Sequence, residues 1–95
     1  MSAYLICHIT VLDPDRWQAY RAAVPATLAP WGGELMFRGR LTTVLAGRHD
    51  GQDTVVIRFP DPGALAAWHA SPAYQALVPL RESAARVTLL AFDPA

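Results

Sequence analysis

Proline and glycine divide the chain into short segments, and each segment has a clear pattern of apolar positions. Residues 4–11 (YLICHITV) are aliphatic and β-branched, which predicts a strand. Asp13-Pro14 follows, and an aspartate before proline is typical of a helix start. Apolar side chains then recur at helical spacing, which predicts a helix over about residues 14–30 that carries Trp17, Tyr20, Val24, Leu28 and Trp31. Pro25 predicts a kink in this helix, and Gly32-Gly33 predicts its end.

The second half of the chain repeats these signals. Residues 34–38 predict a second strand, broken or bulged at Gly39 and resuming over residues 41–45. Residues 47–53 (GRHDGQD) predict a polar hairpin loop before a third strand over residues 54–59. Further Asp-Pro and Ser-Pro starts predict two helices and a last strand, over residues 62–68, 72–85 with a kink at Pro79, and 87–92.

The order of these elements predicts the fold class. A strand, a helix, two strands, a helix pair and a last strand make two crossover units around a central hairpin, which is the α+β, ferredoxin-like split βαβ arrangement. We expect an antiparallel four-stranded sheet in a single domain over residues 1–95, since typical domains have roughly 100–150 residues. The helices can cover only one face of that sheet.

Alternation along the strands divides their side chains between the two faces. One set is purely apolar and suits the face that the helices cover: Leu5, Cys7, Ile9, Val11, Leu35, Phe37, Val55, Ile57 and Phe59. The other set mixes apolar and polar side chains: Tyr4, Ile6, His8, Thr10, Met36, Arg38, Val56 and Arg58. The last strand is ambiguous, because both of its faces are mostly apolar.

An uncovered sheet face with several large apolar groups predicts an interaction surface. The simplest arrangement is a homodimer that packs face to face, and the two sheets then enclose His8, Arg38 and Arg58. A buried arginine needs a partner because an unpaired buried charge is costly. Glu34, Asp53 or another acid could supply the partner, or a bound anion could.

Composition excludes several classes of function. The formal net charge is zero, which argues against nucleic-acid binding. All 8 basic residues are arginine, so lysine Schiff-base, pyridoxal phosphate and Walker-type chemistry are excluded. The single cysteine, Cys7, excludes an intrachain disulfide, and by parity it is a small buried hydrophobe. We expect a cytoplasmic protein that is not in the membrane, with neither a secretory signal nor a run of about 18 apolar residues.

His8 is the strongest candidate for catalysis. Arginines beside it favour its neutral form, which suits a general base. Arg38 and Arg58 could form a fork-shaped receptor for a carboxylate or phosphate, with Arg38 also stabilising an oxyanion. The alternatives are a histidine satisfied by a polar neighbour and arginines held in structural ion pairs across the dimer.

The remaining site candidates are weaker. Tyr4 and Met36, with Ile6 and Val56, would form the apolar wall of the cavity between the sheets. Tyr74 could line a cavity mouth, although packing in the core is the competing interpretation. Arg81 could bind a carboxylate or a helix-end carbonyl, and the favoured alternative is a surface ion pair with Glu82 or an aspartate. The three histidines lack HxH or HExxH spacing, so we expect no metal site, and we expect no cofactor.

The chain resembles the domain-of-unknown-function family 1330, of the dimeric α+β barrel superfamily. The residues that carry the resemblance extend from Tyr4 to Asp93: Tyr4-Leu5-Ile6, Asp13-Pro14, Tyr20, Gly32-Gly33, Arg38-Gly39, Leu45-Ala46-Gly47, Phe59-Pro60, Trp68, Ser71-Pro72, Tyr74 and Arg81. The resemblance implies a homodimer built as a dimeric α/β barrel. The family commonly has glutamate where this chain has Ala46 and Arg58, so the cavity here should be more positive.

Related barrels include cofactor-independent oxygenases and isomerases and also proteins without known activity, and the fold does not choose among them. We therefore expect a dimer that binds a small acidic or oxygenated molecule in the barrel cavity. If it is an enzyme, an isomerase, lyase or oxygenase step without a cofactor is expected. The alternative is a non-catalytic structural or ligand-binding dimer whose polar cavity residues pair with one another.

Overall fold

The computed structural model describes residues 1–94 and has the predicted α+β, ferredoxin-like fold. Its four strands form one antiparallel sheet in the order β2-β3-β1-β4. The elements are β1 (Ala3–Val11), α1 (Pro14–Leu28), the short 3-10 helix η1 (Ala29–Trp31), β2 (Glu34–Arg40), β3 (Asp53–Phe59), α2 (Pro62–Ala70), α3 (Pro72–Gln75), α4 (Val78–Ala84) and β4 (Ala85–Phe92).

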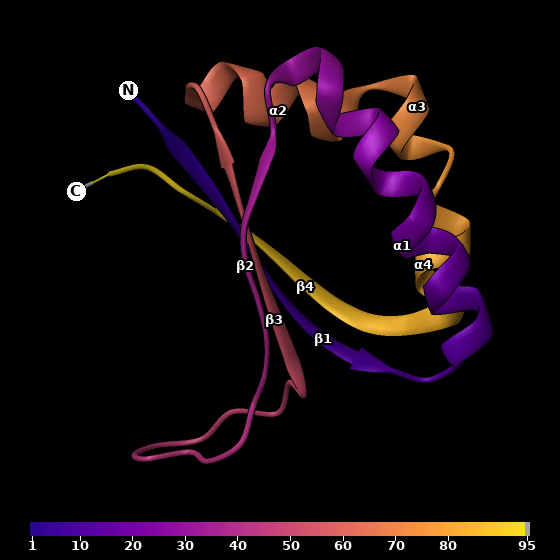
Figure 1. Ribbon diagram of the computed structural model, residues 1–95, viewed down its shortest axis with the longest axis vertical. Helices are drawn as coiled ribbons and strands as arrows, with labels where there is room; N and C mark the ends of the chain where they lie inside the picture. The colour runs from indigo at the N-terminus through magenta and orange to yellow at the C-terminus, as the bar shows by residue number, and fades with distance from the viewer. Residues whose placement is uncertain (95) are drawn as a thin grey trace.

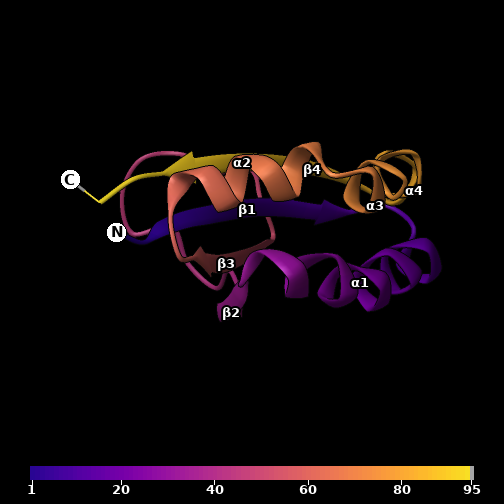
Figure 2. The same ribbon diagram turned by 90° about the horizontal axis from the view of Figure 1, so that it is seen from above.

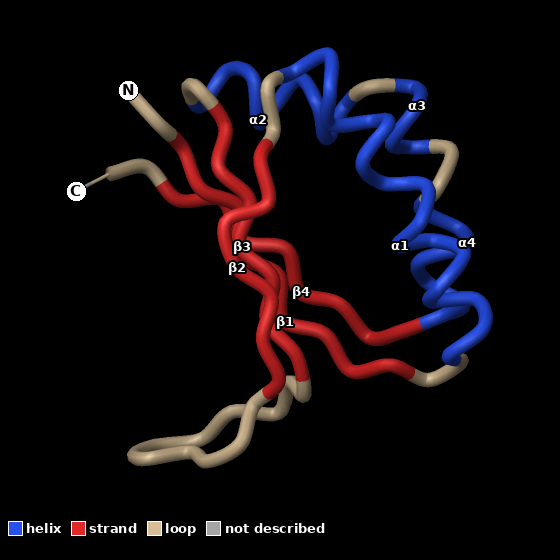
Figure 3. Tube along the Cα trace, in the orientation of Figure 1, coloured by secondary structure: helices blue, strands red, loops and turns tan. Residues whose placement is uncertain are grey.

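All helices lie on one side of the sheet (Figure 1). Seen from above, α1 lies on the side of the molecule that holds β2 and β3, whereas α2, α3 and α4 lie on the side of β1 and β4 (Figure 2). The loop between β2 and β3 projects away from the helices (Figure 3). The opposite face of the sheet, called the open face below, is therefore uncovered within the protomer. No helix within residues 1–94 is long and apolar enough to cross a membrane.

Side-chain caps begin the helices where the Asp-Pro and Ser-Pro pairs predict them. The Asp13 and Asp61 carboxylates accept hydrogen bonds from backbone N–H groups three residues later, at 3.1 and 2.7 Å. Pro25 lies within α1, and the chain turns at Gly32 with φ of 71°, as the glycine pair predicts. The single helix expected over residues 72–85 is wrong, because α3 ends at Gln75 and Pro79 lies in the first turn of a separate helix, α4.

Strand β2 differs from the prediction in two ways. The bulge lies at Met36 and not at Gly39, because the pairing with β3 shifts between Leu35 and Phe37. The expected continuation over residues 41–45 is also wrong, since these residues form part of the loop. One extra residue in β2 reverses the alternation beyond it.

The register of the sheet shows which side chains share a face. Three rows cross all four strands on the open face: Glu34-Arg58-Tyr4-Phe92, Phe37-Val56-Ile6-Leu90 and Gly39-Thr54-His8-Thr88. Three rows face the helices: Leu35-Ile57-Leu5-Ala91, Arg38-Val55-Cys7-Leu89 and Arg40-Asp53-Ile9-Val87. The bulge therefore corrects two assignments: Phe37 belongs to the open face and Arg38 belongs to the face that the helices cover.

The core lies between the helices and the central strands. Its largest fully buried side chains are Trp68, Tyr74 and Phe59. The Trp68 ring stacks obliquely on the Tyr74 ring, with centroids 4.2 Å apart, and contacts the Phe59 ring at 5.5 Å. Strand β2 contributes little to this core, since Leu35 is half exposed although it faces the helices. The layer between α1 and β2 is therefore incompletely filled.

Candidate functional site

A cavity of about 290 Å³ lies between α1 and the helix-facing side of the sheet. Its walls are mainly apolar, and they are formed by Leu5, Ile9, Trp17, Val24, Leu28, Leu35, Val55, Ile57, Trp68, Val87 and Leu89. The volume is just below the about 300–1,000 Å³ that is usual for ligand pockets. Since the pocket lies within one protomer, it is separate from the space between two open faces in which we expected the ligand.

Three charged side chains also line this mainly apolar pocket: Arg21 of α1, Arg38 of β2 and Asp53 of β3. Partial burial and the nearby positive charge of Arg21 both lower the pKa of Arg38. The two acids that the sequence suggested as partners each lie near another arginine: Glu34 lies 3.9 Å from Arg58, and Asp53, which also lines the pocket, lies 3.8 Å from Arg40. Among residues 1–94, neither Arg21 nor Arg38 has an ion-pair partner.

Cys7 lines the same pocket from the centre of β1. Burial raises the pKa of its thiol to about 12, and the positive charge of Arg81 opposes this shift only in part. The thiolate is the nucleophilic form of cysteine, so Cys7 is held in its unreactive state at neutral pH. This agrees with the interpretation of Cys7 as a small buried hydrophobe.

The state of Cys7 predicts slow thiol chemistry in the folded protein. At pH 8 we expect a disulfide reagent such as DTNB to react with the native protein at least about 100-fold more slowly than with the same protein in guanidinium chloride. The denatured sample is the matched control, because it exposes the same thiol at its ordinary pKa. Equal rates in the two samples would contradict the burial of Cys7.

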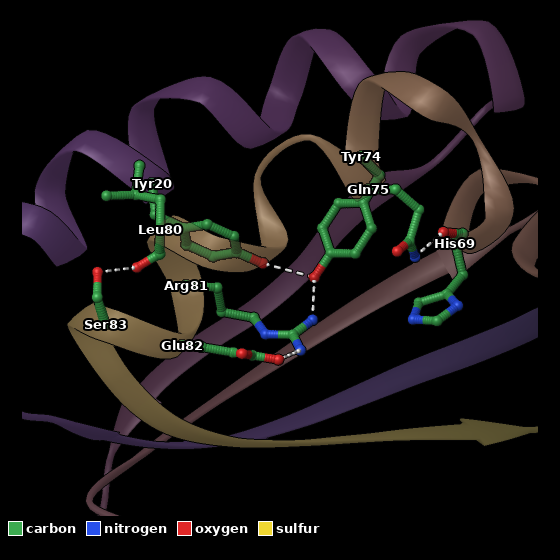
Figure 4. Close-up of polar contacts among 8 residues, drawn as sticks. All are labelled: Tyr20, His69, Tyr74, Gln75, Leu80, Arg81, Glu82 and Ser83. Carbon is green, nitrogen blue, oxygen red and sulfur yellow. Dashed lines mark hydrogen bonds and ion pairs between the residues drawn. The ribbon is translucent and has the colours of Figure 1, made fainter.

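A chain of hydrogen bonds joins Arg81, Tyr74 and Tyr20 (Figure 4). The Arg81 guanidinium donates to the Tyr74 hydroxyl oxygen at 2.8 Å, and the hydroxyl oxygens of Tyr74 and Tyr20 are 2.9 Å apart. Tyr20 lines the pocket, whereas Tyr74 is completely buried and does not. The expectation that Tyr74 lies at a cavity mouth is therefore wrong, and the competing interpretation, packing in the core, describes its position.

Arg81 lies beside this buried pair and not in the pocket lining. Its side chain is only 16% exposed, and besides Tyr74 it contacts the Glu82 carboxylate at 4.0 Å. The ion pair with Glu82 that the sequence offered as the alternative is thus present. A direct contact between Arg81 and a ligand stays a prediction.

His8 lies on the open face, so the expected grouping of His8 with Arg38 is wrong. Its Nδ1 atom is 3.2 Å from the Thr54 hydroxyl, and its ring contacts the His49 ring edge-on with centroids 4.6 Å apart. The loop between β2 and β3 thus folds back onto the end of this face. The role of His8 in proton transfer stays a prediction, on the face opposite Arg38.

The other three predicted contact residues also lie outside the pocket. Arg58 shares a row of the open face with Tyr4, donates to the Ser2 hydroxyl at 3.0 Å and pairs with Glu34. Met36 is the extra residue of the bulge and is half exposed. Their contact with a ligand stays a prediction that requires a second protomer.

Sequence reasoning missed Arg21 and the part that Tyr20 takes in the pocket. Arg21 is four residues after Trp17 and three before Val24, so helical spacing places it on the same face of the helix as these apolar residues. A charged residue on that apolar face could have been recognised from the sequence. The face on which Arg38 lies could not be predicted from the sequence, because it depends on the bulge.

No group of three or more His, Cys, Asp or Glu residues in the described part of the chain could hold a metal ion.

Solved structures of other proteins share this fold at low sequence identity. The RPA0582 protein of unknown function from Rhodopseudomonas palustris is 17% identical, with a TM-score of 0.81 over 99% of this chain and 82% of that chain. A dimeric ferredoxin-like protein of unknown function from Jannaschia sp. CCS1 is 14% identical, with a TM-score of 0.75 over 99% and 100%. SnoaB, a cofactor-independent oxygenase from Streptomyces nogalater, is 18% identical, with a TM-score of 0.68 over 99% and 93%.

These likenesses concern the fold alone. No curated protein matches the sequence. A family model does match it, and the match extends over residues 2–94, nearly the whole chain. The chain belongs to the family described as domain of unknown function (DUF1330).

Proposed function

We propose that this protein binds a small, mostly apolar carboxylate in the pocket between α1 and the sheet. The observation that carries the proposal is the pair Arg21 and Arg38, two cations on a mainly apolar lining that have no ion-pair partner among residues 1–94. Asp53 lies on the same lining, but its carboxylate pairs with Arg40. A bound carboxylate would neutralise one of the two positive charges and accept hydrogen bonds from both guanidinium groups. Guanidinium groups suit this role because they bind carboxylates through two parallel hydrogen bonds.

The pocket favours an apolar body for the ligand. Most of its lining is aliphatic or aromatic, so burial of an apolar group supplies the driving force and the arginines supply orientation. Loss of like-charge repulsion between Arg21 and Arg38 on binding adds to the affinity. Both arginines are exposed, so the free protein tolerates their positive charges without an ion-pair partner.

A reaction at this site would be a cofactor-independent isomerase, lyase or oxygenase step. SnoaB supports only the suitability of the fold for such chemistry. The non-catalytic alternative requires polar residues that pair with one another. Arg40, Arg58 and Arg81 each have such an ion-pair partner, whereas the two pocket arginines have none among residues 1–94. Binding is therefore the core of the proposal.

The protein is proposed to act as a homodimer. The middle row of the open face is entirely apolar, and its outer members Phe37 and Leu90 are 55% and 37% exposed. A second copy packed on this face would remove these groups from water.

A thermal-shift screen with benzoate, phenylacetate and medium-chain aliphatic carboxylates tests the proposal. At 100 times Kd a ligand adds about 2.7 kcal/mol, which for a domain of this size raises Tm by roughly 10 °C or more. Arg38→Gln and Arg21→Gln are each expected to weaken binding by about tenfold to hundredfold, since hydrogen bonds to charged groups contribute about 1.5–3 kcal/mol. Without ligand, neither substitution should lower Tm.

Two control variants make this result specific. Arg48 is exposed in the loop and lies outside the pocket, so Arg48→Gln should leave the response unchanged. His8→Ala separates the two locations for the ligand: a preserved response supports the pocket, whereas a lost response would support the space between the open faces. An identical loss in Arg48→Gln and Arg38→Gln, or no response to any carboxylate, would reject the proposal.

A further inference from the structure

We infer that Tyr20 donates a hydrogen bond into the pocket and binds a carbonyl or enolate oxygen of the ligand, as the last member of a directed chain from Arg81 through Tyr74. The inference rests on the proposed function and defines its ligand further, as a carboxylate that carries a second, uncharged oxygen acceptor. Tyr74 and Arg81 are positioning residues in this arrangement, because neither lines the pocket.

The chemistry of arginine sets the direction at one end of the chain. A guanidinium group has five N–H donors and no acceptor, so Arg81 must donate to the Tyr74 oxygen. Tyr74 is completely buried, with its ring packed against the Trp68 and Tyr20 rings. Water therefore has no access to the Tyr74 hydroxyl.

Burial of Tyr74 decides the second step. If Tyr20 were the donor, the Tyr74 oxygen would accept twice, and its own hydrogen would have no acceptor among residues 1–94. A buried donor without a partner is costly. Tyr74 therefore donates to the Tyr20 oxygen, so that the Tyr74 hydroxyl both accepts a hydrogen bond and donates one.

The Tyr20 hydrogen is then left for the pocket. Tyr20 lies on the pocket lining, and among residues 1–94 its hydroxyl has no protein partner other than Tyr74. An O–H group whose oxygen already accepts a hydrogen bond is a stronger donor, since such chains polarise one another. Burial, and next the hydrogen bond with Tyr74, raise the pKa of Tyr20, so this phenol keeps its proton and binds an acceptor without giving up the proton.

The two polar regions of the pocket define a ligand class. Arg21 and Arg38 take the carboxylate, and Tyr20 takes a carbonyl, enol or enolate oxygen at a different place on the apolar lining. Keto-carboxylates fit this description, whereas simple alkyl carboxylates leave the Tyr20 donor unused. A ligand that lacks the oxygen would leave the Tyr20 donor without a hydrogen bond.

A matched pair of probes tests the assignment by calorimetric titration. 4-Acetylbenzoate and 4-isopropylbenzoate have similar shapes, but only the first has the carbonyl acceptor. We expect wild-type protein to bind the acetyl probe about tenfold more tightly, which corresponds to about 1.4 kcal/mol. Tyr20→Phe should abolish this ratio of the two Kd values. Tyr74→Phe should reduce it in part, because the Tyr20 hydroxyl remains but is no longer oriented, and a purely structural role would leave the ratio unchanged.

Failure of this inference is distinguishable from failure of the proposed function. If both probes bind and the ratio of their Kd values is the same for wild type and Tyr20→Phe, Tyr20 is not the donor, although the pocket still binds carboxylates. If neither probe binds, the proposed function is rejected and the Tyr20 assignment is rejected with it.

A measurement without ligand tests the direction of the chain. NMR of tyrosine hydroxyl protons, assigned with the Tyr20→Phe variant, should show slow exchange with water for Tyr74 and fast exchange for Tyr20. Slow exchange at Tyr20 with fast exchange at Tyr74 would reverse the direction and overturn the inference.

Discussion

Replacement of Trp68 by alanine is expected to lower the free energy of unfolding by about 3–5 kcal/mol, the usual cost of removing a buried aromatic side chain. Trp68 is only 1% exposed, packs on the Phe59 and Tyr74 rings, and donates its indole N–H to the Thr27 hydroxyl at 3.0 Å. Since domains of this size have about 5–15 kcal/mol of stability in total, we expect Tm to fall by about 12 °C or more.

Trp68→Phe is the control for this experiment. It retains an aromatic ring against Phe59 and Tyr74 but removes the donor to Thr27, whose hydroxyl still donates to the Val24 carbonyl at 2.7 Å. The expected loss is therefore closer to the about 1–3 kcal/mol of a broken buried hydrogen bond plus a small cavity. Urea unfolding followed by circular dichroism measures both variants. A Trp68→Ala variant within 1 kcal/mol of wild type would show that Trp68 does not hold the helices to the sheet.

Leu90→Arg is expected to convert the proposed homodimer into a monomer. Leu90 lies in the apolar row of the open face beside Ile6, and at 37% exposure its replacement should leave the protomer folded. In a twofold-symmetric interface the new charge occurs twice, and each buried, unpaired arginine costs several kcal/mol. Even about 3 kcal/mol weakens dimerisation by more than 100-fold.

Light scattering coupled to size-exclusion chromatography measures this effect at micromolar concentration. Leu12→Arg introduces the same charge at a 57% exposed position in the turn before α1, away from the open face, and should remain dimeric. Unchanged circular dichroism must accompany any change in mass. A monomeric wild type, or a dimeric Leu90→Arg variant with native spectra, would contradict a dimer formed through the open face.

The elements of this fold were predictable because local signals specify them. Asp13, Asp61 and Ser71 are each followed by proline, and each side chain caps a helix that begins at the next residue. In the central strands β1 and β3, the side chains that alternation assigned to one face do lie on one face of the sheet. The boundary between α3 and α4 was missed because proline in a first turn and proline in a helix interior have the same sequence pattern.

The candidate site was predictable only in part. The residue type was anticipated, since Arg38 was expected to bind an anion, but its face was not. A β-bulge depends on pairing with the neighbouring strand, and nothing in residues 34–38 marks Met36 as the extra position. The grouping of His8 with Arg38 failed for this reason alone, because every later residue of β2 changed face.

The bulge at Met36 also bears on how family members are aligned. In a relative that lacks this residue the strand would be regular, and the two residues after the equivalent of Leu35 would lie on the faces that Phe37 and Arg38 occupy here. The pocket arginine of that relative would be the second residue after the equivalent of Leu35, whereas Arg38 is the third. An alignment without a gap would therefore match that arginine to Phe37. Insertion or deletion of one residue can therefore leave the pocket intact while making its arginine appear unconserved. Counting from Val55, the partner of Arg38 on β3, removes the ambiguity.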